Sequence, residues 1–157
     1  MLIGYQAGRD ASFSSNSGQI GIGYQALNNV TSGNDNVAIG MSAATNLDTG
    51  VQNTILGAFT GNAITDGGRN TLLGWSCGDS IVGGDYNTLI GVKAGNSLVS
   101  GNFNVLIGEY VDVDTGADSN IFRLGKNGSF IFDGNLNDDD LTINADVVIA
   151  GTYSGSS

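Results

Sequence analysis

The chain has 157 residues, but 26 glycines, no proline and only 13% charged residues make its composition unusual for a globular domain. Its 15 acidic and 5 basic residues give a net charge of −10, which disfavours binding to nucleic acid or anionic lipid. Histidine is absent and Cys77 is the single cysteine, which excludes the commonest general base, an intrachain disulfide and a cysteine zinc site. No apolar run is long enough to cross a bilayer, and no signal peptide opens the chain.

The chain is built from a short repeat, marked by an apolar residue followed by glycine. The first step between these pairs is nineteen positions, and the next six steps are all seventeen positions. The pairs are Ile3-Gly4, Ile22-Gly23, Ile39-Gly40, Leu56-Gly57, Leu73-Gly74, Ile90-Gly91, Ile107-Gly108 and Leu124-Gly125. We call the glycine of each pair the anchor glycine. Because Met1 falls inside a repeat, we expect the chain to be a fragment of a longer protein.

Further positions keep the same period. Glycine stands seven residues before the anchor glycine and asparagine four before it; small residues stand three after it, and apolar residues seven after it. The asparagines are Asn36, Asn53, Asn70, Asn87 and Asn104; the small residues are Ala7, Ala26, Ala43, Thr60, Cys77, Ala94 and Val111; the apolar residues are Val30, Leu47, Ile64, Ile81 and Leu98. So many sets of equivalent positions, which we call columns, would not share one period by chance.

A 17-residue unit is too short for the helix hairpin of helical repeats, but it suits one coil of short strands and tight turns. The period predicts an all-β fold, a parallel β-solenoid or β-roll, over residues 1–125. Stacking turns each column into a row of like residues. The asparagines then either bond from coil to coil or cap their own turns, and both roles are structural.

The strand before each anchor glycine is apolar on both faces. One face carries Val37 and Ile39 and their equivalents, and the other carries Ala38, Ile55, Leu72, Leu89 and Leu106. A strand that is apolar on both faces is buried on both, whereas a thin solenoid has a single interior. The second face therefore needs a cover, and identical chains around a symmetry axis provide one. We expect Ala38, Ile55, Leu72, Leu89 and Leu106 to form the interface of a homotrimer.

Three sequence segments resemble those of known proteins: Ile3-Gly4-Tyr5-Gln6-Ala7-Gly8, Ile22-Gly23-Tyr24-Gln25-Ala26-Leu27 and Asn87-Thr88-Leu89-Ile90-Gly91-Val92-Lys93-Ala94-Gly95. They resemble the head repeats of trimeric autotransporter adhesins and the similar repeats of phage tail-fibre proteins, over residues 1–125. The resemblance implies a left-handed parallel β-roll, three chains per fibre, an extracellular place on a virion or cell surface, and an adhesive role. The 17-residue step is longer than is usual in autotransporter heads, which favours a tail fibre over the head of a bacterial surface adhesin.

The 17-residue period stops after Gly125. Residues 126–157 contain three short β segments, at 129–132, 141–143 and 147–149, separated by Gly and Asp/Asn turns. They look like the short-strand shafts of tail fibres. Because such a segment is too small to fold alone, we expect it to intertwine with two sister chains and form a shaft.

Two groups of residues are candidates for chemistry. Asp112, Asp114 and Asp118 have an alternate spacing that could gather carboxylates around calcium, but a solvated turn explains them better, and we predict no metal site. Cys77 stands in the column of small residues beside Ala43 and Ala94, which favours a buried, inert thiol over a nucleophile.

Aromatic residues are the candidates for surface binding. Tyr24 and Trp75, like Tyr5, directly follow an anchor glycine, and Tyr86 and Phe103 stand five residues before one. Aromatic faces stack on sugars, but they also pack between neighbouring coils, and packing is the better explanation.

Three functions compete. We expect a non-enzymatic, adhesive fibre segment without a cofactor, whose partners are its own copies, other fibre or tail proteins, and a host surface glycan or protein. A glycan depolymerase would need paired acids in a groove, and the acids are scattered over turns. An ice-binding solenoid would need regular threonine ranks, but Thr54, Thr71 and Thr88 form one rank that Val37 and Val105 interrupt.

Overall fold

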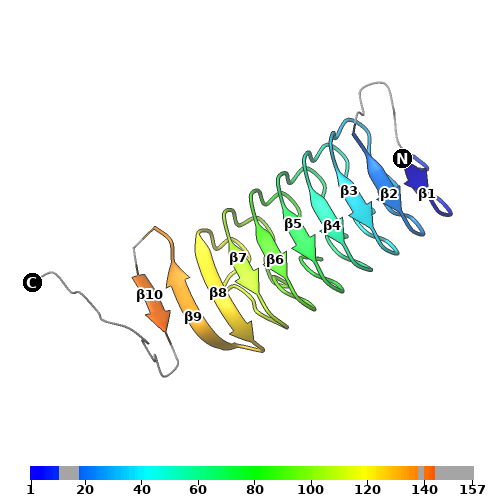
Figure 1. Cartoon of the computed structure of the whole chain (residues 1–157). Coiled ribbons are helices and arrows are strands. Elements are labelled where there is room, and N and C mark those ends of the chain that lie inside the picture. The colour runs from blue at the N-terminus through cyan, green and yellow to red at the C-terminus, as the bar shows by residue number, and fades with distance from the viewer. Residues whose placement is uncertain (11–17, 138–139, 144–157) are drawn as a thin grey trace, which may run out of the picture.

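The computed structural model describes residues 1–10, 18–137 and 140–143 of the chain. Within these ranges it contains ten strands and no helix, and the strands form one sheet in chain order (Figure 1). The strands are β1 (Leu2–Ile3), β2 (Ile20–Ile22), β3 (Val37–Ile39), β4 (Thr54–Leu56), β5 (Thr71–Leu73), β6 (Thr88–Ile90), β7 (Val105–Ile107), β8 (Ile121–Lys126), β9 (Ser129–Asn135) and β10 (Asp140–Ile143).

Strands β1 to β8 pair in parallel, each with the next along the chain. From β2 onward every pair has a register of one repeat, so that Ile55 lies beside Leu72 and Leu72 beside Leu89. Equivalent residues of successive coils therefore stack along the rod. This arrangement confirms the predicted all-β parallel solenoid and its 17-residue coils.

The parallel stacking ends at β8. Strand β9 folds back antiparallel on β8, and β10 pairs antiparallel with β9, so both continue the solenoid's own sheet. The segments expected at 129–132 and 141–143 lie in β9 and β10. The segment expected at 147–149 lies outside the described residues.

The interior of the coil corrects the predicted trimer interface. Ala38, Ile55, Leu72, Leu89 and Leu106 are the middle residues of β3 to β7, and all five are 0% exposed in the single chain. They pack with Val30, Leu47, Ile64, Ile81 and Leu98, the column seven residues after the anchor glycine. The core therefore lies between these two columns, and a face that fills the interior of its own coil is not available to another chain. The opposite strand face points outward.

The turn after each strand requires glycine at the anchor position. At Gly74 the φ angle is 147°, and a Cβ atom would collide with the carbonyl oxygen of Gly91 in the next coil. Backbone N–H groups of the same turn donate hydrogen bonds to both neighbouring coils. Gly74 donates its N–H to the Leu56 carbonyl of the preceding coil, and Gly78 donates to the Ala94 carbonyl of the following one. Both the backbone conformation and the close stacking of coils exclude a side chain at this position.

The asparagine column forms a continuous ladder inside the rod. The Oδ1 atom of Asn53 accepts hydrogen bonds from the backbone N–H of Asn70 at 3.0 Å and from its Nδ2 at 3.1 Å. Asn70 Nδ2 also donates to the Gly84 carbonyl at 2.8 Å. The same bonds recur at the other ladder positions, Asn36, Asn87 and Asn104. The sequence left two roles open for these asparagines, and in the structure they bond from coil to coil.

Candidate interaction surface

The outward face of β2 to β7 is an apolar strip. Its residues are the first and third of each strand, while the middle residue is buried. Among the third residues, Ile39 is 37% exposed and Leu73 is 43% exposed. The strip consists of Ile20, Ile22, Val37, Ile39, Thr54, Leu56, Thr71, Leu73, Thr88, Ile90, Val105 and Ile107. It contains no charged residue, and Thr54, Thr71 and Thr88 form its one polar rank.

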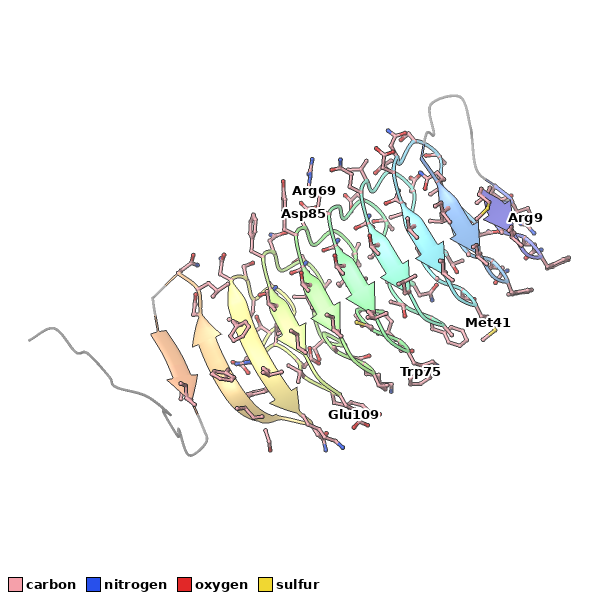
Figure 2. All side chains as sticks on the ribbon, in the orientation of Figure 1. Arg9, Met41, Arg69, Trp75, Asp85 and Glu109 are labelled. Atoms are coloured by element: carbon pink, nitrogen blue, oxygen red, sulfur yellow. The ribbon has the colours of Figure 1, made fainter. Side chains whose placement is uncertain are left out.

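Two rows of residues flank this strip. Figure 2 shows Arg69 and Asp85 on one side of the strands and Met41, Trp75 and Glu109 on the other. We define the leading edge as the residues six and five before the anchor glycine, and the trailing edge as those one and two after it. The leading edge comprises Asn34/Asp35, Val51/Gln52, Gly68/Arg69, Asp85/Tyr86 and Asn102/Phe103. The trailing edge comprises Tyr24/Gln25, Met41/Ser42, Ala58/Phe59, Trp75/Ser76, Val92/Lys93 and Glu109/Tyr110.

The three aromatic candidates for surface binding lie on these edges and are about half exposed: Tyr24 is 46% exposed, Trp75 47% and Tyr86 45%. Two of them stack on an aromatic ring of a neighbouring coil. The ring centroids of Tyr5 and Tyr24 are 5.7 Å apart, and those of Tyr86 and Phe103 are 4.8 Å apart. The rings therefore pack between coils and at the same time present an aromatic surface to solvent.

The edges also carry two cations that the sequence reading did not single out. Arg69 lies 5.2 Å from the centroid of the Tyr86 ring. The ammonium group of Lys93 lies 5.4 Å from the Trp75 ring and 5.6 Å from that of Tyr110. The other three basic residues of the chain form ion pairs, whereas within the described ranges Arg69 and Lys93 form none. Both cations are thus held against aromatic rings without a direct ion pair, although Lys93 is close enough to Asp79 to act on the pKa of that carboxyl.

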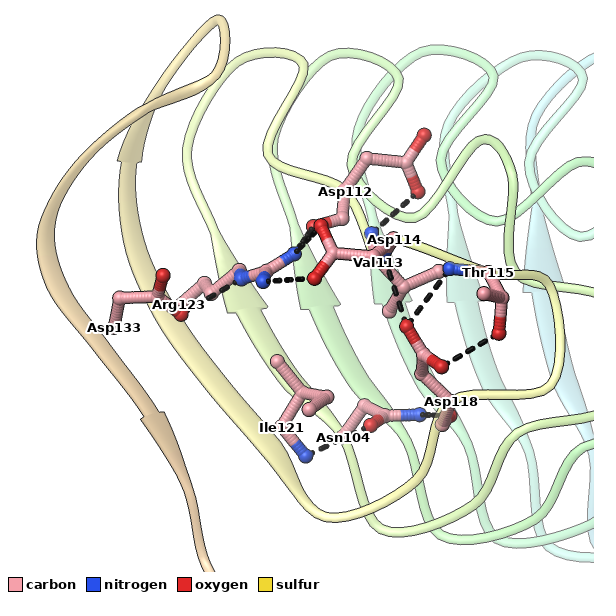
Figure 3. A network of polar contacts seen from close by, with 9 residues as sticks. All are labelled: Asn104, Asp112, Val113, Asp114, Thr115, Asp118, Ile121, Arg123 and Asp133. Atoms are coloured by element: carbon pink, nitrogen blue, oxygen red, sulfur yellow. Dashed lines mark hydrogen bonds and ion pairs between the residues drawn. The ribbon is translucent and has the colours of Figure 1, made fainter. Parts of the chain in front are cut away.

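The three aspartates considered for calcium lie at the end of the solenoid, and each has its own hydrogen-bond or ion-pair partners (Figure 3). The carboxylate of Asp112 accepts from the Ser97 N–H, that of Asp114 pairs with Arg123 at 2.8 Å, and that of Asp118 accepts from the backbone N–H groups of Asp114 and Thr115. The hydrogen bond from the Thr115 hydroxyl to Asp118 is the largest cause of a lowered pKa of that carboxyl. No group of three acids, cysteines or histidines in the described residues is arranged to hold a metal ion.

Arg123 occupies the position where the core column ends. It lies beside Leu106 in the parallel register, but its guanidinium pairs with Asp114 and with Asp133 of β9, both at 2.8 Å. Burial alone would lower the pKa of Arg123, but the hydrogen bonds to these two carboxylates raise it above its ordinary value. In the sequence, a charged residue at a position of the apolar column indicates that the core column ends there. The sequence analysis did not use this signal.

Cys77 lies in the interior, in the column of small residues. Its side chain is 0% exposed, and its Sγ lies 3.3 Å from the carbonyl oxygen of Leu89, to which it donates. Burial is the largest cause of its raised pKa, which reaches about 12. The thiol is therefore protonated at neutral pH and closed to solvent, unlike the exposed, ionised thiol of a nucleophile.

Among the described residues, no helix has the length and apolar character needed to cross a membrane. Comparison of the chain with family models, with curated proteins and with solved structures returned no match.

Proposed function

We propose that this chain is a structural and adhesive segment of a trimeric fibre, on a virion as part of a phage tail fibre that takes part in host attachment. The observation that carries the proposal is the apolar strip on the outward face of β2 to β7. A regular coil has already buried its core, so an apolar face that runs along the whole rod serves contacts with other molecules.

Identical chains are the simplest partners for a strip that repeats coil by coil. A partner with the same 17-residue period presents an apolar residue at every level where this chain presents one. Three rods around a common axis would cover all three strips at once. The shaft that we predict for residues 126–157 would continue the same fibre.

Light scattering tests the assembly. The purified chain is expected to have three times the 16.0 kDa mass of one chain at micromolar concentration, and a stable, soluble monomer would contradict the proposal. Substitution of Leu73 by aspartate tests the strip itself.

The proposed role is binding by surface and not catalysis. The acids of the coils lie at separate turn positions, and the thiol is buried and protonated. A fibre that presents the same outer surface three times gains avidity for a repetitive glycan even where each contact is weak. Incubation of the trimer with bacterial surface polysaccharides should release no reducing ends beyond those released by the heat-denatured protein, and release above that control would identify an enzyme.

A further inference from the structure

We infer that the chains of the assembly pack in parallel and in register, with the leading edge of each chain against the trailing edge of the next, so that Lys93 of one chain pairs with Asp85 of its neighbour. The inference rests on the proposed trimer and adds its orientation, its register and the residues that fix them.

The size of the apolar strip requires the edges to take part. Six strands spaced about 4.8 Å apart and three residues long, at about 3.3 Å each, give a strip of roughly 300 Å². Stable interfaces bury about 800 Å² on each partner. The strip alone is too small, and the residues next to it are those of the two edges, where Trp75, Val92 and Phe103 continue the apolar surface.

Cyclic symmetry decides which edges meet. When parallel rods turn their strips toward a common axis, every interface is heterologous, and one edge of each chain meets the opposite edge of the next. The leading edge of one chain therefore faces the trailing edge of its neighbour. At equal height the facing residues belong to the same coil in the two chains.

The charges on the edges agree with that register. In the coil of β6, Asp85 lies on the leading edge and Lys93 on the trailing edge, so equal height brings opposite charges together. In the coil of β5 it brings Arg69 to the face of Trp75, a favourable cation–π arrangement. Displacement by one coil in one direction sets Arg69 against Lys93, which is a like-charge contact. It also sets Asp85 against Glu109, whose carboxylate already pairs with Lys126 of its own chain at 3.0 Å. Displacement in the other direction sets Asp85 opposite Trp75, and the Lys93 ammonium group then lies 5.4 Å from that ring instead of directly opposite the carboxylate. Equal height is also the register that a closed trimer requires, because rotation about a common axis does not shift one chain along it, and at equal height Asp85 faces Lys93.

The two charges are held apart within one chain. The Oδ1 atom of Asp85 accepts from the Gly68 N–H at 2.7 Å, which fixes the carboxylate to the leading edge. The backbone N–H of Lys93 donates to the Trp75 carbonyl at 2.9 Å, and its side chain lies over the Trp75 ring on the trailing edge. Strand β6 lies between them. Both side chains are half-buried, so each still has an accessible charged end for the neighbouring chain.

Disulfide cross-linking tests the register directly. In the variant with Asp85→Cys and Lys93→Cys, oxidation is expected to join neighbouring chains and to give a covalent trimer on a non-reducing gel. The buried Cys77 does not interfere. The control with Asp85→Cys and Glu109→Cys, displaced by one coil, is expected to stay uncoupled. If scattering shows a trimer but only the control couples, or neither variant does, the register is wrong while the trimer stands. If the wild-type chain is a monomer, the proposed function fails as well.

Charge reversal provides a second test that needs no oxidation. Asp85→Lys alone and Lys93→Asp alone each set like charges across the interface, and each should weaken assembly roughly tenfold or more at low salt. Because the two residues do not meet within one chain, recovery of assembly in the double variant can come only from contact between chains. Asp66→Lys makes the same charge change on an exposed residue that belongs to neither edge, and it should leave assembly unchanged. Equal weakening in the double variant and in the single ones would overturn the pairing.

Discussion

The backbone N–H and the side-chain Nδ2 of Asn53 both donate to a single atom, Oδ1 of Asn36, at 2.9 and 3.0 Å. The second hydrogen of the same Nδ2 bonds the Gly67 carbonyl of the next coil at 2.9 Å. One amide thus satisfies groups in the coil before it and in the coil after it. In the interior of a thin rod, where water does not reach these groups, this arrangement satisfies the backbone at a turn.

Replacement of Asn70 by alanine should destabilise the rod by at least about 2 kcal/mol. The change removes the acceptor for the N–H and Nδ2 of Asn87 and the donor to the Gly84 carbonyl, all of them buried. Denaturant unfolding measures the effect. Asn46→Ala is the control, because Asn46 is exposed and its loss should cost less than about 1 kcal/mol. Equal losses in the two variants would contradict a structural role for the ladder.

Gly74→Ala should destabilise the rod strongly, by more than about 3 kcal/mol, because the new Cβ would meet the backbone of Gly91 and the φ angle of 147° is closed to other residues. Gly128→Ala separates the two effects. Gly128 has a φ of 76°, but no atom lies within 4 Å of the added Cβ, so backbone strain alone should cost about 1–2 kcal/mol. Thermal melting of both variants measures the difference, and similar melting temperatures would argue against close stacking of coils.

The neighbours Leu72 and Leu73 offer a matched test of which strand face points outward. Leu72 is 0% exposed and Leu73 is 43% exposed. Leu72→Asp buries an unpaired charge in the coil and should abolish the β-type circular dichroism of the rod. Leu73→Asp should keep that spectrum and dissociate the assembly, as scattering would record. A folded Leu72→Asp monomer would reverse the assignment of the faces, and an intact Leu73→Asp trimer would remove the strip from the interface.

Alkaline pH should destabilise the chain through Cys77. Burial raises the pKa of this thiol from its ordinary 9.0 to about 12, so the folded state keeps the proton while the unfolded state loses it above pH 9. The stability that depends on this thiol is therefore complete below pH 9 and falls as the pH rises toward 12. At 1.36 kcal/mol for each pKa unit, the loss reaches about 4 kcal/mol.

Cys77→Ala isolates this effect from the titration of lysine and tyrosine, because alanine occupies the same column at Ala43 and Ala94. The free energy of unfolding of the variant, measured from pH 8 to 12, should fall less steeply than that of the wild type. Parallel curves would show that the thiol is not buried as described. A thiol reagent should likewise modify wild-type Cys77 only after unfolding.

The sequence alone was sufficient to predict the 17-residue coil and which residues stack from one coil to the next. The 17-residue period determines which residues stack, because in a solenoid equivalent positions must lie on one another. The asparagine column, the small column that holds Cys77 and the apolar column that begins at Val30 all followed from this rule. They needed no knowledge of the path of the chain within a coil.

The direction of the strand faces could not be obtained in the same way. Both faces are apolar, so alternation alone does not say which one fills the interior, and our prediction placed Leu72 at the wrong surface. The useful signal was the threonine rank at Thr54, Thr71 and Thr88. An interior with no water disfavours hydroxyl groups without partners, so the face that tolerates threonine is the outer one. The roles of Lys93 and Arg123 depend on contacts between different coils, which spacing along the chain does not reveal.

The fixed register between coils has a consequence for the length of the rod. Every ladder contact of a coil goes to the coil directly before or after it, so removal of residues 58–74 would join Gly57 to Trp75 and recreate the same junction. The rod would become shorter by one strand spacing, about 4.8 Å, with no new packing problem. A gene that encodes such a rod can therefore change its reach in whole units, by recombination between its own repeats. In the trimer that we propose, chains of unequal unit number would not match along their edges, so each length variant would assemble with its own kind.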